Sequence, residues 1–497
     1  MNKKNKGITA GHLTMMALGS VIGGSFFLGS SVAINAAGPS ILLSFILGGV
    51  LIYFILYALS EMTVANPHGG SFSAFAAEEL GPGAGFVVGW IYWLGTIFSM
   101  SSEATAIPIL AQQWFPNISI AGIGTVIIVT VTLLNLLGAN RLSKLGSGLS
   151  SIKIVSIVFF IIFAFILILG ILPGTPFIGA GELMREPLIP GGIKGIAGSM
   201  LIVIFSYAGF EIIGLAASEA ENPQKTIPKA IGYTVLSLVG LYILYAVVLL
   251  PLIPTAELSE KMSPIVLSLD RHGISWAGNV MNLVLISASL SAMLAAVFGL
   301  GRMIRSLASQ GHAPKWLGDK TDVPYRGILF SGLAMLIGLG FGNLFSRAYL
   351  VLITSGGFAL LFTYAVIMAS HIRFRKRNGC PPSGKCQMPG YPYTSWLTLI
   401  SLIVVLFSMP FISGQSAGLV TGLVMVVLCF LIYIAVGLRT RVPRGLSVKG
   451  LHRYHSRFST EFSEELIQRT SNKNKKKTCN SSKPILENDE RSRNSTN

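Results

Sequence analysis

The sequence predicts an all-α integral membrane protein with about twelve transmembrane helices, and three observations support this fold class. Of the 497 residues, 52% are hydrophobic and only 11% are charged, whereas a soluble domain carries about 25% charged residues. About twelve apolar stretches are long enough to cross a bilayer, which takes roughly 17 to 25 residues. Two of these stretches are interrupted in their middle, at 21–26 and 206–211.

The apolar stretches define a transmembrane region with a polar segment at each end. We expect residues 1–10 to be a cytoplasmic N-terminus, residues 11–440 the transmembrane domain, and residues 441–497 a basic cytoplasmic tail whose composition is typical of disorder. The predicted spans lie near 11–36, 40–65, 84–112, 119–140, 148–172, 195–218, 231–254, 274–302, 328–343, 347–371, 394–412 and 416–438.

The distribution of Lys and Arg predicts the orientation of these spans. If the N-terminus is cytoplasmic, most of the 37 Lys and Arg residues fall in cytoplasmic segments, as the positive-inside rule requires. We therefore expect a multi-pass protein of the cell membrane with both termini in the cytoplasm. The net charge of +17 then reflects topology, and the basic tail either contacts the anionic heads of membrane lipids or is a solvated segment that helps topology. It does not indicate a nucleic-acid partner, because the basic residues lie in loops and a tail.

The two interrupted spans are the first and the sixth, so each begins a group of five spans. Because five is odd, the second group, at about 195–371, is inverted in the membrane relative to the first, at about 11–172, and the helices at 394–438 are additional. Inverted repeats with discontinuous helices are typical of transporters, whose substrates bind between the two breaks. Helix N-termini there attract anions and free carbonyls attract cations, so a zwitterion fits. The alternative is that the glycines only allow close helix packing.

Four stretches carry a family resemblance: GSVIGGSFFLGSS, SEMTVANPHGGSFSAFAAEELGPGAGFVVGWIYW, SSEATAIPILAQQWFP and FSYAGFEIIGLAASEAENPQKTIPKAI. Together they resemble bacterial amino acid permeases of the amino acid/polyamine/organocation superfamily, over about residues 7–440. The resemblance implies a five-plus-five inverted-repeat fold with discontinuous first and sixth helices. It also implies a small-molecule amino acid as substrate, protons as the coupling ion and no cofactor. The oligomeric state is left open.

The resemblance also implies a substrate site at the two breaks. Backbone amides at Gly24 and Ser25 would hold the substrate carboxylate, while carbonyls near Val21, Phe205 and Ala208 would accept from its ammonium group. Related transporters typically have Gly-x-Gly where this chain has Gly23-Gly24-Ser25. The side chain of Ser25 would either narrow the site or form a hydrogen bond with the substrate. The full candidate set is Val21, Ile22, Gly23, Gly24, Ser25, Glu103, Phe205, Ser206, Tyr207, Ala208 and Gly209.

Charged residues inside the spans are the other candidates, since a charge in the membrane is costly and indicates function. By resemblance, Lys153 replaces a sodium ion by bridging carbonyls, although it could instead snorkel to the cytoplasmic headgroups. Glu211 resembles an acidic gate on a proton path, or is a structural carboxyl that binds freed amides. Glu103 either selects the substrate or anchors a helix. Glu61, near a cytoplasmic span end, is expected to pair with the basic loops.

Two other function classes rank below transport. A membrane enzyme would need a nucleophile with a nearby base, or clustered His and acidic residues, and the seven His residues are scattered over loops, tails and span ends. Cys380 and Cys386, in a Cys-x5-Cys spacing without a second pair, are a weak metal signal, so we predict no catalytic residue and no metal. A transporter-like sensor would need a soluble signalling domain, and we expect none in this sequence. The sequence therefore favours a proton-coupled importer of a neutral amino acid, with a cationic amino acid or polyamine transporter or exchanger as the alternative.

Overall fold

The structure, a computed structural model, describes residues 8–65, 72–171, 175–217, 220–319, 321, 323–379 and 388–439. Within these residues the chain is helical and has no β-strand, with one isolated bridge between Ile8 and Ala220. The predicted all-α membrane fold is confirmed. The tail at 441–497 and most of the predicted N-terminus lie outside the described residues. The helices are α1 Ala10–Val21, α2 Gly24–Ala37, α3 Ile41–Ala65, α4 Phe72–Leu80, α5 Pro82–Ala111, α6 Ile120–Asn135, α7 Ala139–Ile168, α8 Gly192–Ser206, α9 Ile212–Leu215, α10 Pro223–Leu249, α11 Pro264–Arg271, α12 Ser275–Ser309, α13 Tyr325–Gly342, α14 Ala348–Asn378, α15 Tyr393–Ser408 and α16 Ser416–Arg439.

Every predicted span coincides with one helix or with a pair of helices. The first span is split into α1 and α2, and the sixth into α8 and α9, at the positions of the two sequence interruptions. Eight helices among the described residues are long and apolar enough to cross a membrane, and three further apolar helices are shorter. The structure therefore supports a multi-pass membrane protein. The division into two repeats and two additional helices stays a prediction.

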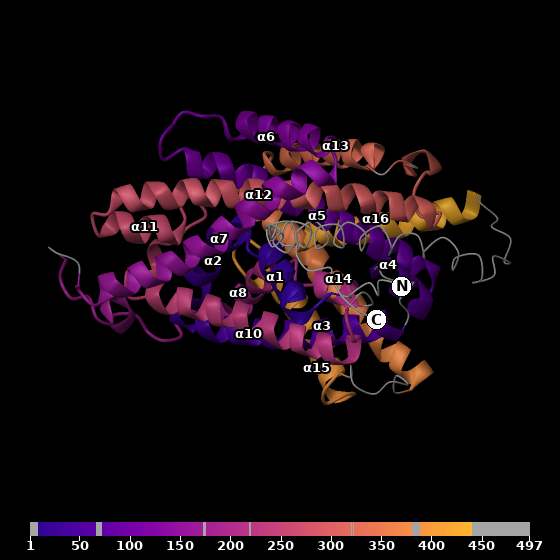
Figure 1. Cartoon of the computed structure of the whole chain (residues 1–497), viewed down its shortest axis with the longest axis horizontal. Helices are drawn as coiled ribbons and strands as arrows, with labels where there is room; N and C mark the ends of the chain where they lie inside the picture. The colour runs from indigo at the N-terminus through magenta and orange to yellow at the C-terminus, as the bar shows by residue number, and fades with distance from the viewer. Residues whose placement is uncertain are drawn as a thin grey trace, which may run out of the picture. The chain divides into compact units, whose positions relative to one another are not determined.

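Two helices, α4 and α11, lie outside the predicted spans. Each is too short to cross a bilayer, which takes about twenty residues, and each carries charged residues near its end, Glu78 and Glu79 on α4 and Asp270 and Arg271 on α11. Figure 1 shows them at opposite ends of the helix bundle. We call these the α4 end and the α11 end of the bundle.

The core consists mainly of two hydrophobic clusters. One is built largely from α1, α2, α3, α8 and α10, and the other from α5, α6, α12 and α13. Helix α14 packs along α5 and also against α8, α15 and α16 (Figure 1), and most of its apolar length is buried inside the bundle. This burial makes α14 a central helix, so residues on it can reach both clusters.

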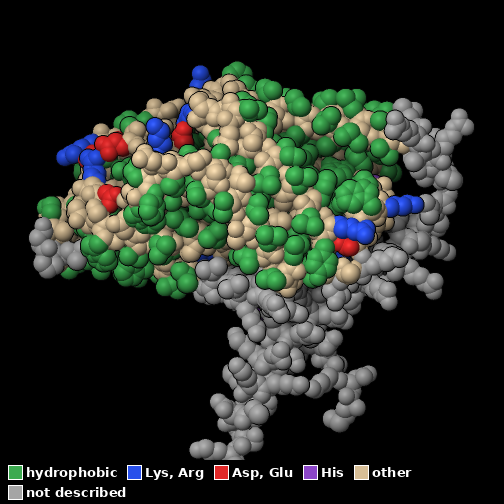
Figure 2. Space-filling model, turned by 90° about the horizontal axis from the view of Figure 1, so that it is seen from above, with side chains coloured by type: hydrophobic (Ala, Val, Ile, Leu, Met, Phe, Trp, Pro, Cys, Tyr) green, Lys and Arg blue, Asp and Glu red, His purple; other side chains and the backbone are tan. Residues whose placement is uncertain are grey.

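The surface between the two ends is apolar, as a surface facing lipid must be. Figure 2 shows hydrophobic side chains spread over the visible face, while Lys, Arg, Asp and Glu gather toward its ends. Large side chains that would be buried in a soluble protein are exposed on several helices, for example Val155, Leu236 and Ile337. This pattern fits a bundle whose outer solvent is hydrocarbon.

Candidate functional site

The breaks in the first and sixth spans lie against each other. Ser20 Oγ, at the end of α1, donates a hydrogen bond to the Gly209 carbonyl oxygen at 2.8 Å. Gly209 has φ +105°, and a Cβ built there would lie 2.9 Å from the Ser20 carbonyl oxygen and 3.1 Å from the Val21 nitrogen. Only glycine tolerates both this backbone conformation and this approach. The two discontinuities therefore form one site.

The first break consists of Ile22 and Gly23, both in extended conformation. Helix α2 then begins at Gly24, and the Phe26 amide donates to the Gly23 carbonyl at 3.2 Å. The first amides of a helix have no acceptor within the helix and carry the positive end of its dipole. Gly24 and Ser25 supply these amides, so the break presents a backbone that can hold an anion.

An aromatic cluster covers one side of the breaks. The rings of Phe26 and Tyr242 stack at 4.3 Å between centroids, and Tyr207 lies 4.8 Å from Tyr242. The hydroxyl of Tyr242, on α10, donates to the Ser206 carbonyl at 2.8 Å, which satisfies one of the free carbonyls at the end of α8. Tyr242 was not predicted as a site residue, because no motif or periodicity in an apolar span shows which residues its tyrosines will contact.

The predicted residues around the sixth-span break are brought to the site in different ways. The Phe205 carbonyl accepts from the Ala208 amide at 2.9 Å. Ser206 Oγ bonds to the Ile202 carbonyl of its own helix, and the Tyr207 hydroxyl donates to the Phe45 carbonyl on α3 at 3.1 Å. The side chains of Ser206 and Tyr207 are therefore engaged with protein, and their backbone is what faces the break.

Lys153, on α7, points into the bundle. Its side chain is 1% exposed, and its Nζ donates to the Ile22 carbonyl oxygen at 3.0 Å. The ammonium group thus occupies the first break, where an unwound carbonyl has no helical partner. In this structure the side chain does not snorkel toward the headgroups.

Glu211 lies directly after the second break and is 5% exposed. Its Oε2 accepts from the Gly209 amide at 2.8 Å and from the Tyr364 hydroxyl at 3.2 Å, while its Oε1 accepts from the Tyr92 hydroxyl at 3.2 Å. Tyr92 belongs to α5 and Tyr364 to α14, so one carboxyl joins three spans. Neither tyrosine was predicted from the sequence, for the same reason as Tyr242.

Glu103, on α5, is 2% exposed and lies close enough to Lys153 to interact with it electrostatically. It interacts in the same way with Tyr349 at the start of α14. Glu61 is part of a separate buried cluster at the α4 end, where it pairs with His371 Nε2 at 2.8 Å and with Arg375 Nε at 3.2 Å. Both partners belong to α14 itself.

Residues of the two breaks keep some exposed surface, whereas α2 beyond the first break is covered toward the α11 end. Ser20 is exposed, and Gly209 is partly exposed. On the other side, Ser31 is fully buried and its Oγ donates to the Met262 carbonyl at 3.0 Å, and Asn35 Nδ2 donates to the Thr255 carbonyl at 3.2 Å. The segment 251–263 thus closes over α2.

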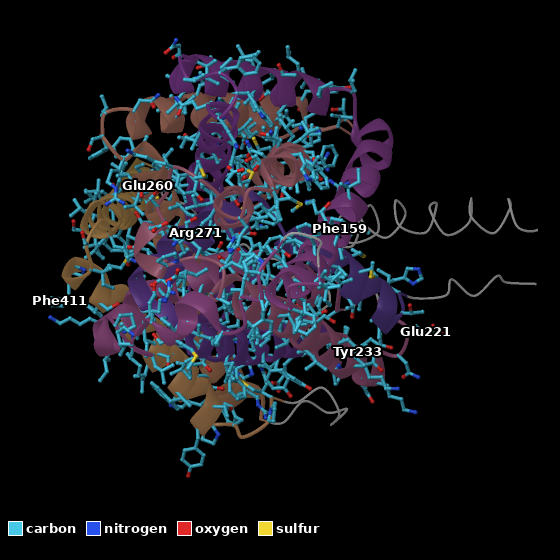
Figure 3. The ribbon with its side chains drawn as sticks, turned by 90° about the vertical axis from the view of Figure 1, so that its left-hand side faces the viewer. Phe159, Glu221, Tyr233, Glu260, Arg271 and Phe411 are labelled. Carbon is cyan, nitrogen blue, oxygen red and sulfur yellow. The ribbon has the colours of Figure 1, made fainter. Side chains whose placement is uncertain are left out.

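An ion pair ties this closing segment to the start of α14. Glu260 accepts two hydrogen bonds from the Arg347 guanidinium, at 2.5 and 2.6 Å. Figure 3 looks onto this end, with Glu260 and Arg271 labelled. Arg271 in turn pairs with Glu257 at 2.8 Å. Charged contacts between loops and helix ends therefore connect the elements that cover the α11 end.

In the part of the chain that the structure describes, no group of three or more His, Cys, Asp and Glu side chains could hold a metal ion. One Gly-x-Ser-x-Gly sequence occurs at 414–418, but its serine starts helix α16. A nucleophile elbow needs a strand-to-helix turn instead. Cys380 and Cys386 lie outside the described residues.

Comparison with known proteins places these features in context. The sequence profile of the family described as "Amino acid permease" matches residues 12–444. The chain is 32% identical over 456 residues to the uncharacterized amino acid permease YtnA of Bacillus subtilis (strain 168), covering 90% of this chain and 98% of the relative.

Two further relatives from the same organism carry substrate names. The chain is 32% identical over 431 residues to the gamma-aminobutyric acid permease, covering 84% of this chain and 91% of the relative. It is 31% identical over 457 residues to the probable threonine/serine transporter YbxG, covering 90% of this chain and 98% of the relative.

Proposed function

Because the chain belongs to the amino acid permease family, and is therefore an amino acid transporter and not an enzyme, we propose that it imports a neutral amino acid together with a proton. The observation that carries this proposal is the contact between Lys153 Nζ and the Ile22 carbonyl. A fixed ammonium group at the first break supplies the positive charge that a bound cation would otherwise supply. Import then needs no sodium.

The substrate would bind where the two breaks meet. Its carboxylate would accept from the Gly24 and Ser25 amides at the start of α2, as anions do at helix N-termini. Its ammonium would donate to backbone carbonyls near Val21 and Ala208. The Phe205 carbonyl already accepts from the Ala208 amide, so it would contribute through its second lone pair.

A neutral substrate is favoured by the charges around this site. Glu103 interacts electrostatically with Lys153, so an ionised Glu103 would offset the ammonium charge and leave little net charge for a substrate side chain to balance. Two relatives are named for gamma-aminobutyric acid and for threonine and serine. The presence of a second acid, Glu211, favours a cationic amino acid or a polyamine as the alternative, handled by import or exchange.

The proton would be carried by Glu211. Its carboxyl contacts the Gly209 amide and two tyrosine hydroxyls, and a carboxyl in such a position can gain or lose a proton as the break opens and closes. The α4 end would be cytoplasmic, because the last turn of α14 there holds Arg375, Lys376 and Arg377.

Uptake into proteoliposomes tests the coupling ion. We expect accumulation of a labelled amino acid under an inward proton gradient, with no loss when choline replaces sodium and full loss when a protonophore is added. Sodium-dependent uptake that ignores the protonophore would overturn the proposal. A thermal-shift screen against the amino acids and polyamines identifies the substrate class, because a ligand stabilises the protein it binds. Stabilisation by polyamines alone would favour the alternative.

A further inference from the structure

A buried polar cluster joins three helices at the α4 end, apart from the two breaks. It consists of Glu61 on α3, His371 and Arg375 on α14, and Ser395 on α15, and all four residues are buried. The three helices pack against one another (Figure 1). A buried ion pair adds little net stability, because removing the charges from water is costly. We therefore examined which parts of the molecule this cluster holds in place.

Hydrogen bonds fix the orientation of the His371 ring. Its Nε2 lies 2.8 Å from Glu61 Oε2, and an ionised carboxylate can only accept, so Nε2 carries the hydrogen of this bond. On the other side of the ring, Nδ1 lies 3.3 Å from Ser395 Oγ. The hydroxyl of Ser395 also lies 3.1 Å from Met388 Sδ, a weaker acceptor. His371 therefore joins α3 to α15 through its two nitrogens.

The Glu61 carboxyl is the centre of the cluster. Besides His371, it meets Arg375 Nε at 3.2 Å through Oε1, and its Oε2 accepts from the Met388 amide at 3.4 Å. The Arg375 guanidinium lies over the Tyr391 ring, 4.6 Å from its centroid. One carboxyl of α3 is thus tied to α14 and to the segment before α15.

Helix α3 also supports the backbone of the second break. Leu59, two residues before Glu61, packs against α9, where a Cβ built at Gly214 would lie 2.4 Å from Leu59 Cδ2. Helix α9 begins directly after Glu211. A movement of α3 would therefore be transmitted to the backbone that carries Glu211.

Helix α14 supports the Glu211 side chain itself. The Tyr364 hydroxyl donates to Glu211 Oε2 at 3.2 Å, which is longer than most bonds between a hydroxyl and an oxygen acceptor. His371 follows Tyr364 by seven residues, which is about two helical turns, so both lie on the same side of α14. A small displacement of α14 against α3 would break the bond between Tyr364 and Glu211.

We propose that Glu61 and His371 are positioning residues for transport. Their hydrogen bond fixes α3 against α14 and so keeps Glu211 within reach of the Tyr364 hydroxyl. The inference rests on the proposed function, in which Glu211 carries the proton. Glu61 and His371 act through the contact between Tyr364 and Glu211 and do not bind the substrate.

A double-mutant cycle tests this role. The full chain, His371→Leu, Tyr364→Phe and the double variant are placed in proteoliposomes, and rates are normalised to folded protein. The labelled probe is the amino acid that stabilises the parent most in the thermal-shift screen. KM and the maximal rate are measured under an inward proton gradient, and exchange is measured with the probe on both sides. Two residues that act through one contact give effects that do not add.

We expect each single variant to lower the maximal rate several-fold with a KM close to that of the parent. The double variant should be no slower than the slower single variant. His371→Gln, whose amide can still donate to Glu61, should recover most of the rate. Arg377→Gln is the matched control and should behave as the parent, because it breaks a half-exposed ion pair between the same turn of α14 and Glu79 on α4.

Losses that multiply in the double variant would overturn the proposal, because His371 would then act independently of Tyr364. A parental rate in either single variant would overturn it as well. If His371→Leu does not fold, the same cycle is measured with Glu61→Gln, which keeps an acceptor oxygen but loses the charge.

The proposed function fails separately, if the parent does not accumulate the probe under a proton gradient. The cycle is then evaluated from the exchange rates. Non-additive losses there would support the positioning role of Glu61 and His371, and additive losses would overturn it.

Discussion

Glu211 Oε2 holds the backbone amide of Gly209 at 2.8 Å, two residues before it in the chain. This contact joins the backbone of the second break to a carboxyl group that also accepts hydrogen bonds from the Tyr92 and Tyr364 hydroxyls. The shape of the break and the charge of Glu211 are therefore linked. A change in the protonation of this carboxyl would therefore alter the hydrogen bond that it accepts from the backbone facing the substrate.

Glu211→Gln should separate binding from coupling. The amide keeps an oxygen that can accept from Gly209, so we expect amino acid binding close to that of the parent, but a glutamine cannot cycle a proton. Binding is measured by thermal shift and coupling by proton-driven accumulation in proteoliposomes. Concentrative uptake equal to that of the parent would assign Glu211 a purely structural role.

Lys153→Met should remove the charge from the first break while keeping a side chain of similar length. The Ile22 carbonyl would lose its donor, which costs about 1–3 kcal/mol for a buried group, and proton-driven uptake should be lost. Thermal unfolding and uptake are measured together. Lys229→Met is the control, because Lys229 is exposed on α10, and it should behave as the parent. Normal uptake by the Lys153→Met protein would contradict the proposed role.

Gly24→Leu should abolish binding at the breaks by crowding the first amides of α2. Leucine is well tolerated by helices and by lipid, so the folded protein should still be recovered from the membrane. The matched control is Gly240→Leu on α10, where a built Cβ meets no atom within 4 Å. Unaltered affinity in the Gly24→Leu protein would move the substrate site elsewhere.

Arg347→Gln should destabilise the closed α11 end in a pH-dependent way. Hydrogen bonding by Arg347 lowers the pKa of Glu260 from its ordinary value of 4.5. A carboxyl whose pKa falls on folding stabilises the protein above its unfolded pKa, and this contribution is lost as the pH drops through the lower, folded pKa.

The parent should therefore unfold at a higher temperature than Arg347→Gln at neutral pH. The difference should correspond to at most about 1 kcal/mol for a partly exposed pair, and it should disappear in acid. Arg185→Gln, which breaks a pair with Glu182 whose arginine is 76% exposed, should have less effect. A gap between parent and Arg347→Gln that persists in acid would show that packing and not charge causes it.

The sequence by itself determined the class of fold, the approximate spans and the positions of both breaks. Long apolar stretches have few other structures available in lipid, because every backbone group must be bonded within a helix. An interruption such as Gly23-Gly24-Ser25 can be recognised in such a stretch, because its small and polar residues differ from the apolar residues on both sides. The buried charges Glu103, Lys153 and Glu211 were visible for the same reason.

The tertiary structure decided which groups meet. Tyr92, Tyr242 and Tyr364 reach the breaks from three different helices, and no periodicity in the sequence reveals this. In a soluble protein the buried face of a helix differs from its polar face, but in a membrane both the core side and the lipid side are apolar. The side that faces the site is therefore set only by the packing of all the helices together.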